Sequence, residues 1–131
     1  MNLTKQEQAI VDYHRDTIAT GKVGRDEKGR PVTVFSTGIE LLDASGRRTG
    51  KFVSVPGFID NAQGNRYIPK RNGRVDEDFL REYWAKEIQA NVFPVYNSSK
   101  ELNKRSQEIH KIMDDEEQMA RRAQKRPLMM D

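Results

Sequence analysis

The residues best suited to acid–base or metal chemistry in this sequence are its two histidines, His14 and His110. Asp114 follows His110 by four residues, a spacing that puts both side chains on one face of a helix. A histidine and a carboxylate in that arrangement could exchange a proton or supply two ligands to a metal ion. No second histidine or carboxylate motif lies near them in the sequence, so a solvated helix face is the better interpretation of this pair.

The sequence patterns that mark common enzyme sites are missing. Residues 114–117 are consecutive acids, but they lack the Asp-x-Asp-x-Asp-Gly spacing of a helix–loop–helix calcium site. No serine stands in a nucleophile elbow, and the glycines form no phosphate-binding fingerprint. The chain has no cysteine, which excludes disulfides and thiolate metal sites. We therefore predict a protein that is not an enzyme and has no catalytic residue, cofactor or metal ion.

Basic residues near two predicted turns could instead contact phosphate groups. The candidate phosphate contacts are Arg47, Arg48, Lys70, Arg71 and Arg74. The formal net charge is only +3, although the sequence pI is about 9.2. Residues 1–75 carry 13 Lys and Arg against 8 Asp and Glu, whereas residues 76–131 carry 10 against 12. This mild asymmetry differs from the dense basic block of a dedicated nucleic-acid-binding protein, so DNA contact is a secondary hypothesis.

Apolar and aromatic side chains form the third group of candidates, because Trp and Tyr are favoured anchors of protein interfaces. Phe79, Tyr83 and Trp84 fall on one face of a predicted helix. Packing in the core is the simpler interpretation of this face, and an interface anchor is the functional one. The candidate interface residues are Ile10, Tyr13, Trp84, Phe93, Tyr96, Leu102, Ile109 and Met113.

These residues must be positioned by local structure, and the first predicted element is a helix that ends at Thr20. Thr4 and Glu7 form a capping box at its start, and Gly21 supplies a stop signal. Its apolar stripe is thin, which gives weak burial, so we expect the helix to need a partner surface. The predicted stripe is Ala9, Ile10, Tyr13 and Ile18, with His14 as a possible addition.

A small β-unit follows a predicted turn at residues 26–29. The β-branched and aromatic run Val32–Leu42 predicts a strand, with Gly38 as the site of a bulge. Lys51–Pro56 predicts a second strand, and Tyr67–Pro69 is the third candidate. Two or three antiparallel strands joined by short loops are the simplest arrangement.

The best amphipathic element is a helix predicted from Asp76 to about Gln89. Asp76 suits its N-cap, and the acids of the first turn complement the helix dipole. Most of its apolar residues fall at the spacings of one broad face, which we expect to pack against the strands. They are Phe79, Leu80, Tyr83, Trp84, Ala85 and Ile88.

The stretch from residue 91 to residue 113 predicts a joint between this body and a second long helix. Phe93–Tyr96 is expected to return the chain to the sheet. Ser98 and Glu101 read as a capping box, and no breaker occurs before Pro127, so the helix could span roughly 25 residues. Its apolar face thins after Met113, so the later turns should project or lie on a partner. The apolar positions are Leu102, Ile109, Ile112, Met113 and Met119, with Ala120.

Length and composition bound the whole molecule. A chain of 131 residues suffices for one modest core, and 33% charged against 35% hydrophobic residues is polar for a compact protein. No apolar run approaches the roughly 20 residues of a membrane-spanning helix, and the N-terminus is too charged for a signal peptide, so we expect a soluble protein made in a cytoplasm. We predict an α+β fold in which a small antiparallel hairpin or sheet is packed by one amphipathic helix. The predicted division is an N-terminal helical arm (1–21), a compact body (22–97), and a C-terminal helix with a charged tail (98–131).

The order of these features resembles a small module of tailed-bacteriophage virion proteins. Members show a strand pair, a strand that ends in Ile-Pro, an acid-capped helix, a short aromatic segment and a helix that ends near a histidine. The corresponding segments here are Val32-Thr33-Val34, Tyr67-Ile68-Pro69, Asp76 to Ile88, Phe93-Pro94-Val95-Tyr96 and Ser98 to His110. The module occurs alone or within large virion proteins that enter the host with the genome, some of which also carry cell-wall-degrading domains. The resemblance covers about two thirds of the chain and brings no catalytic residue with it. The first helix and the basic tail depart from the pattern.

The resemblance implies a structural component of a virion, in the tail, the portal region or the ejected internal complex. Its expected partners are other virion proteins in a symmetric, multi-copy assembly, and its expected locations are the virion and, during assembly, the host cytoplasm. An alternative hypothesis is a small basic nucleic-acid-binding or regulatory protein of the infected cytoplasm. A third is an accessory to a wall-degrading enzyme, which would co-purify with that enzyme.

Overall fold

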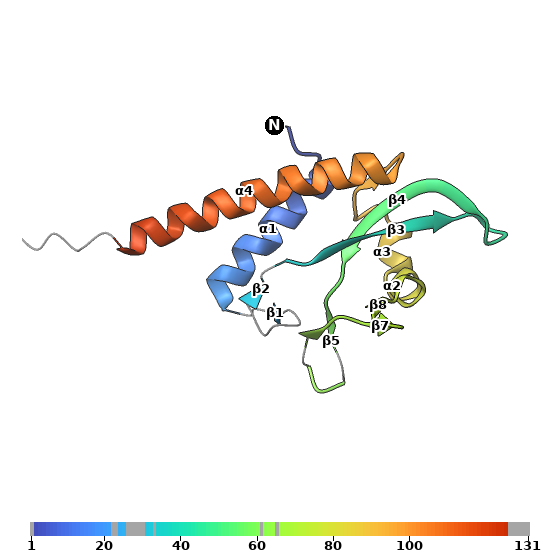
Figure 1. Cartoon of the computed structure of the whole chain (residues 1–131), viewed down its shortest axis with the longest axis horizontal. Helices are drawn as coiled ribbons and strands as arrows, with labels where there is room; N and C mark the ends of the chain where they lie inside the picture. Colours follow the sequence, from blue (N-terminus) through green and yellow to red (C-terminus); the bar gives the residue numbers. More distant parts are fainter. Residues whose placement is uncertain are drawn as a thin grey trace, which may run out of the picture.

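A short three-stranded antiparallel sheet lies between two groups of helices (Figure 1). The computed structural model describes residues 2–21, 24–25, 31–32, 34–60, 62–64 and 66–125. The predicted α+β class, with small antiparallel sheets, an N-terminal helix and a long C-terminal helix, is confirmed. In chain order the elements are α1 (Lys5–Thr20), β1 (Gly24–Arg25), β2 (Pro31–Val32), β3 (Ser36–Leu42), β4 (Arg48–Pro56), β5 (Ile59–Asp60), β6 (Arg66–Tyr67), β7 (Lys70–Arg71), β8 (Arg74–Val75), α2 (Glu77–Tyr83), α3 (Ala85–Gln89), β9 (Val95–Tyr96) and α4 (Ser99–Lys125).

The central sheet has the strand order β3-β4-β9. β3 and β4 form a hairpin whose register runs from Ser36 opposite Pro56 to Leu42 opposite Arg48. β9 pairs with the other edge of β4, and the Ser54 N–H donates to the Pro94 carbonyl at 3.0 Å. The prediction that Phe93–Tyr96 returns the chain to the sheet is therefore confirmed. β5 pairs with β6, and β7 pairs with β8, in separate two-stranded ribbons.

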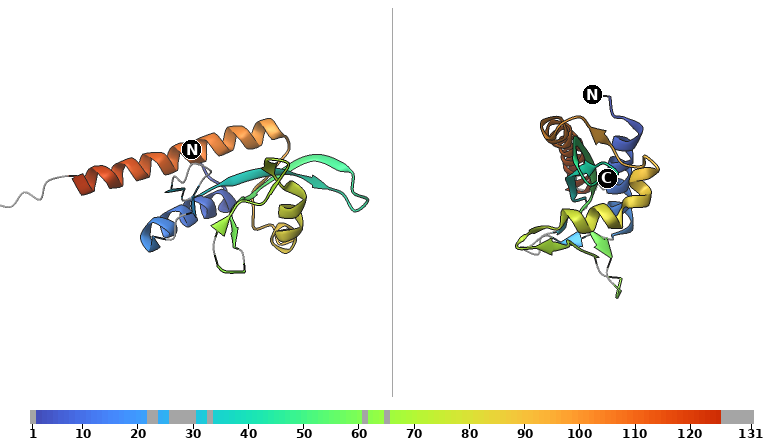
Figure 2. Two further views of the ribbon diagram at one scale, coloured as in Figure 1. Left: turned by 60° about the horizontal axis from the view of Figure 1, so that its bottom comes forward. Right: turned by 90° about the vertical axis from the view of Figure 1, so that its right-hand side faces the viewer.

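The two faces of this sheet pack against different helices, because successive side chains of a strand point to opposite sides. Ile39, Val53 and Val55 share one face and form a buried cluster with Ile59 and with Leu80 of α2. α4 and α1 lie on the other side of the sheet (Figure 2). A register slip of one residue would exchange the two faces, so both helical layers help to specify the strand pairing.

The amphipathic helix predicted from Asp76 is present as two shorter helices, α2 and α3, which meet at Trp84. The Asp76 carboxylate accepts a hydrogen bond from the Phe79 N–H at 3.1 Å, as expected of an N-cap. Leu80 is fully buried, whereas Phe79 and Tyr83 are exposed. The buried stripe is thus narrower than the predicted one, although the packing of this segment on the sheet is confirmed.

The N-terminal helix begins with both hydrogen bonds of the predicted capping box, between Thr4 and Glu7, and ends at Gly21 in the left-handed conformation. The predicted stripe of α1 is wrong. Ala9, Tyr13 and Ile18 are exposed and Ile10 is half-buried. The buried face lies about one position further round the helix, because α1 packs on α4 rather than on the strands alone. Its members are Glu7, Val11, His14 and Thr17.

The partner surface that α1 was expected to need is provided by α4 of the same chain. Val11 forms a second buried cluster with Ile109 and Met113 of α4. The Ser98 hydroxyl accepts the Glu101 N–H at 3.1 Å and caps α4, as predicted. α4 spans 27 residues, and its terminal turns extend beyond the rest of the described chain (Figure 1).

Gly38 allows α4 to approach the sheet, and the bulge predicted at this position is wrong. A Cβ atom built on Gly38 would lie 2.7 Å from Leu102 Cδ1, so a larger residue here would force the buried Leu102 side chain to shift. The irregularity in the β3–β4 register lies between Glu40 and Leu42 instead. The strand predicted from Val32 begins at Ser36 as part of the central sheet. The turn predicted at 26–29 and the tail from 126 lie outside the described residues.

Candidate interaction surfaces

A buried ion-pair network joins α1, β9 and α4 through the carboxylate of Glu7. Its Oε2 accepts hydrogen bonds from the Tyr96 hydroxyl at 2.7 Å and from Arg105 Nε at 2.8 Å. Its Oε1 accepts the Thr4 N–H at 2.9 Å and a second bond from the Arg105 guanidinium. Arg105 Nη2 also donates to the Asn2 carbonyl at 3.0 Å. Each oxygen of this fully buried carboxylate therefore has two donors.

This environment strongly favours the charged form of Glu7. The hydrogen bond from Arg105 is the main cause that lowers the pKa of Glu7 to about 2, with further donors at Thr4 and Tyr96. Burial, followed by the hydrogen bond to Glu7, raises the pKa of the Tyr96 hydroxyl well above its usual range. A carboxylate with such a low pKa and four donors is a poor proton acceptor. The network therefore suits a structural role that fixes three elements together.

A second ion pair joins the other ends of the same two helices. Arg15 Nε of α1 donates to Glu116 Oε2 of α4 at 3.1 Å. The hydrogen bond with Arg15 lowers the pKa of Glu116 below its usual range. Arg15 is exposed, so solvent and salt weaken this pair more than the buried network. Together the two ion pairs fix the direction of α4 relative to the body.

An apolar pocket lies between α1 and the strands. Its volume is about 150 Å³. Three candidate interface residues, Ile10, Tyr13 and Phe93, meet here. The Arg66 guanidinium lies 5.4 Å from the centre of the Tyr13 ring, a cation–π contact at the pocket edge. The full lining is Gln6, Ala9, Ile10, Tyr13, Val34, Phe35, Ser36, Ser54, Pro56, Phe58, Val92 and Phe93.

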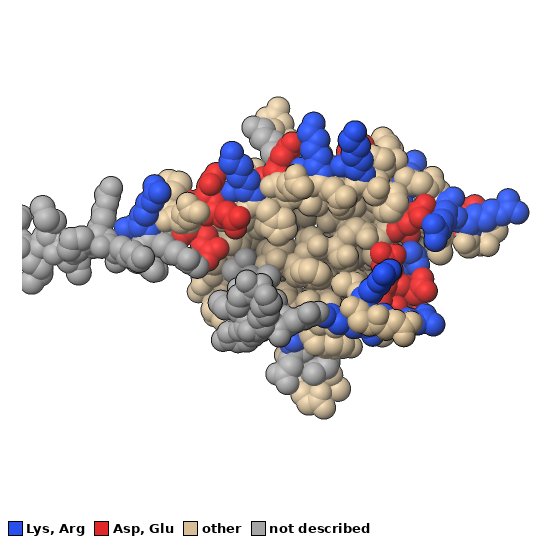
Figure 3. Space-filling model, viewed as in Figure 1, with Lys and Arg blue, Asp and Glu red and all other residues tan. Residues whose placement is uncertain are grey.

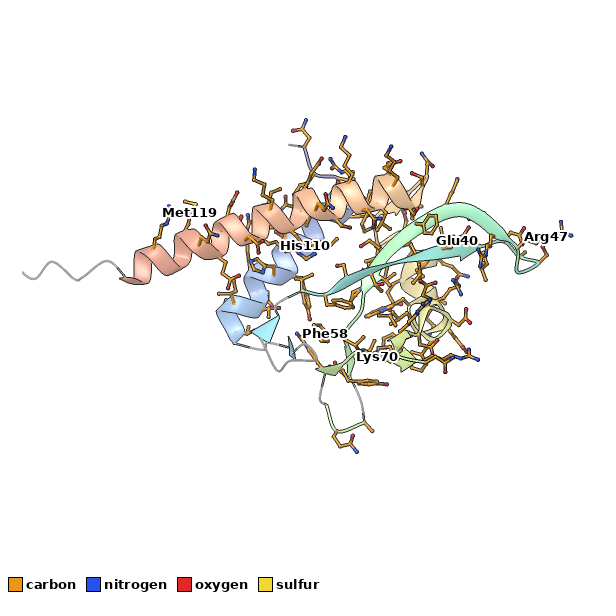
Figure 4. The ribbon with its side chains drawn as sticks, viewed as in Figure 1. Glu40, Arg47, Phe58, Lys70, His110 and Met119 are labelled. Carbon is orange, nitrogen blue, oxygen red and sulfur yellow. The ribbon has the colours of Figure 1, made fainter. Side chains whose placement is uncertain are left out.

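The side chains that line this pocket are uncharged. Figure 3 shows an uncharged centre on this face, with charged side chains toward its edges. Phe58, which lines the pocket, is labelled within the same central area in Figure 4. The shape suits one apolar side chain or ring, but no described group there could carry out acid–base chemistry.

The other candidate interface residues are used inside the chain. Tyr96, Leu102, Ile109 and Met113 are buried, so they present no free surface to a partner in this structure. Trp84 is half-buried, and its Nε1 donates to the Pro56 carbonyl at 2.9 Å. The ring of Trp84 also packs edge-to-face against Phe93 at 5.4 Å. Leu102, Ile109 and Met113 are buried because α4 packs closely on α1 and on the sheet. This packing covers the apolar face of α4 that was expected to bind a partner.

The candidate phosphate contacts lie on two separate hairpins. Arg47 and Arg48 lie at the outer end of the β3–β4 hairpin, and Arg48 Nε lies 3.8 Å from Glu40 Oε1. Lys70, Arg71 and Arg74 lie on the β7–β8 hairpin, and Arg71 Nη1 lies 4.0 Å from Asp78 Oδ2. Figure 4 shows Arg47 and Lys70 well apart, and Figure 3 shows acidic side chains among the basic ones at this end. The two groups thus form no continuous basic surface on the face shown.

The last described turns of α4, residues 114–125, carry exposed side chains next to Glu116, which pairs with Arg15. Met119 is 69% exposed, the highest value among the exposed large hydrophobic side chains. Asp115 and Arg122 are also exposed, and together with Met119 they fall at i, i+4 and i+7 on one helix face. We call these three residues the distal stripe. In Figure 4, Met119 points away from α1 and the sheet.

Comparisons with known proteins add no relative to this picture. No protein-family model, curated protein or solved structure matches the chain. Within the described residues, no group of three or more His, Cys, Asp and Glu side chains could hold a metal ion. None of the described helices is long and apolar enough to cross a membrane.

One feature of the site, the burial of Arg105, could have been recognised from the sequence. Arg105 lies between Leu102 and Ile109 at spacings of three and four residues, so it occupies the apolar stripe of α4. A charged residue at such a position signals a buried ionic partner. Glu7 was identified only as a capping residue, since no local pattern reveals a partner 98 positions away. His14, the possible addition to the predicted stripe of α1, is buried, as that addition implies.

Proposed function

We propose that this chain is a non-enzymatic structural and interaction component of a tailed-phage virion, which docks on neighbouring subunits through the distal turns of α4. The proposal rests on the change in side-chain burial along α4. Its first half is buried against α1 and the sheet, whereas its distal turns leave the body with Met119 exposed at 69%. Methionine is enriched in protein interfaces, so Met119 on the end of a helix that extends past the body suits a contact with another protein.

The body gives this helix a fixed direction. The Glu7–Arg105 pair fixes its first half, and the Arg15–Glu116 pair fixes it one turn before Met119. A helix fixed in this way loses little conformational freedom when a partner binds it, which favours affinity. The body therefore holds α4 in one orientation, and the distal turns form the interface with the partner.

The phage context is supported by the order of sequence motifs that resembles a virion module. In the structure the Phe93–Tyr96 segment contains β9 and the acid-capped segment forms α2 and α3, whereas the helix that begins after Ser98 runs past His110 to Lys125. Within the proposal the chain belongs to the tail, the portal region or the ejected internal complex. It would be present in the host cytoplasm during assembly and in the virion afterwards.

Mass spectrometry of purified virions tests the proposal. We expect the chain to be present at a fixed stoichiometry to a known tail or portal protein. Particles assembled with Met119→Glu, which places a charge on the contact, should contain less of the chain than particles assembled with Met119→Leu. Absence of the wild-type chain from washed particles would refute a virion role.

The alternative, a nucleic-acid-binding protein, is favoured only by the two basic hairpins. Gel-shift titrations with duplex and single-stranded DNA at low and moderate salt separate the two functions. The alternative predicts salt-sensitive binding that Arg47→Glu and Arg71→Glu both weaken, with Lys104→Glu, an exposed position on α4, as the control. No shift at low salt would exclude it.

A further inference from the structure

The distal stripe is self-complementary. Asp115 and Arg122 lie on either side of a point between residues 118 and 119, each three and a half positions away. At 1.5 Å per residue, each charge lies roughly 5 Å along the helix axis from that point. If a second copy of the same helix lies antiparallel on this face, Asp115 of each copy comes opposite Arg122 of the other. The two Met119 side chains then meet near the centre.

We infer that the distal turns of α4 pair with the distal turns of a second copy of this chain, in antiparallel orientation about a two-fold axis near Met119. Because it names the neighbour on which the helix docks, this inference rests on the proposed function. The contact is isologous, so the same residues serve both copies. Its two ion pairs set the register, and the paired methionines supply the apolar contact.

The surroundings of the stripe leave room for this partner. Met119 points away from α1 and the sheet in Figure 4, and the distal turns extend past the body in Figure 1. In an antiparallel pair centred here, residue 112 of one copy lies opposite residue 125 of the other. The two bodies then lie toward opposite ends of the paired segment.

The size of the contact makes the pairing weak in isolation. Fourteen paired residues are about 21 Å long, and a helix is about 10 Å wide. Such a contact buries far less than the roughly 1,200 Å² of a small specific interface. We therefore expect self-association only at high concentration for the free protein, and stronger pairing where many copies are held together in a particle. Salt should weaken it because exposed ion pairs set the register.

A charge-exchange experiment tests the pairing directly. Sedimentation equilibrium at low salt should show weak dimerisation of the wild-type chain. Asp115→Arg and Arg122→Asp should each weaken dimerisation about tenfold or more, because each homodimer then places like charges opposite one another. An equimolar mixture of the two variants should regain wild-type association, since every facing pair is then of opposite charge.

Matched controls separate this register from a general charge effect. Asp114→Arg makes the same change of charge one residue away, off the stripe, and should leave dimerisation unchanged. Because the chain has no cysteine, Met119→Cys offers a second readout. It should crosslink to a dimer with a short bismaleimide, whereas Asp114→Cys should crosslink much less. Circular dichroism verifies that each variant is folded.

The outcomes are distinct. Single variants that associate like the wild type, or a mixture no better than its components, would overturn the inference, as would a wild type that is monomeric at about 1 mM. In those cases a different virion protein covers the stripe, and the proposed function survives if the chain is found in particles. Absence from particles combined with rescue in the mixture would overturn the proposed function but not the pairing.

Discussion

At the scale of single residues, Glu7 has two structural tasks that no other side chain in the described chain could take over. It closes the capping box of α1 and also accepts two bonds from Arg105 of α4. Removing its charge while keeping its size leaves the Arg105 guanidinium without its main partner. A buried charge without a partner destabilises the folded state by more than the intact ion pair stabilises it.

Glu7→Gln should therefore lower the free energy of unfolding by about 2–4 kcal/mol, somewhat less than for a fully buried pair because Arg105 can still reach solvent. Urea denaturation followed by circular dichroism measures this change. Glu108→Gln is the matched control, since Glu108 also pairs with Arg105, at 3.2 Å, but is partly exposed. Its cost should stay below about 1 kcal/mol. Equal costs for both variants would contradict the role given to Glu7.

The pH dependence of stability follows from the same carboxylate. Its pKa is about 2 in the folded chain against a usual value of 4.5. Because the folded pKa is the lower one, the contribution of Glu7 is complete above about pH 5 and is lost as the pH falls from 4.5 toward 2. The loss amounts to about 3 kcal/mol. Unfolding free energies of the wild type and Glu7→Gln, measured between pH 2 and 7, should converge at the acidic end. A constant difference across this range would refute the assignment.

At the scale of elements, the packing of α4 on the sheet depends on one missing side chain. A Cβ on Gly38 would lie 2.7 Å from Leu102 Cδ1 and 2.8 Å from Leu102 Cδ2. Leu102 is buried, so it cannot move aside freely. The close approach of α4 thus explains both the glycine in the strand and the burial of a residue that was expected at an interface.

Gly38→Ala should destabilise the chain by about 1–3 kcal/mol through overpacking. The test is a double-mutant cycle with Leu102→Ala, because removal of the leucine methyl groups makes room for the new Cβ. In that background the cost of Gly38→Ala should fall below that in the wild type. Additive costs would show that the glycine is needed for the conformation of the strand and not for the approach of α4.

Elements with local signals could be predicted from the sequence, and those decided by distant contacts could not. The capping residues Thr4, Asp76 and Ser98 mark their helices because the signal lies within one turn. The buried face of α1 was misplaced by about one position, because the residues three and four positions from Val11 are polar or charged, while its apolar contacts, Ile109 and Met113, lie about a hundred residues away. The same reason explains why Arg105 was missed as the partner of Glu7.

At the scale of the whole molecule, α4 packs in the core with its first half and extends beyond the rest of the described chain with its terminal turns (Figure 1). Leu102, Ile109 and Met113 are buried in its first half, whereas Met119, three residues beyond the Arg15–Glu116 pair, is 69% exposed. The loss of apolar positions after Met113, visible in the sequence, predicted this division. The self-complementarity of the distal stripe could not be predicted from the sequence alone, because it depends on which positions of α4 are exposed.

Hydrogen exchange on the isolated protein measures this division and its dependence on concentration. At low micromolar concentration, amides between Leu102 and Met113 should exchange slowly, because opening them disrupts the buried cluster with α1. Amides from Gln118 to Lys125 should exchange faster by orders of magnitude, since frayed helix ends open with little cost in free energy.

At millimolar concentration and low salt, pairing with a second copy should slow exchange in the distal turns of the wild type. Asp115→Arg should not show this protection, whereas Asp114→Arg should. Slow exchange in the distal turns at every concentration would mean that they are stable without a partner.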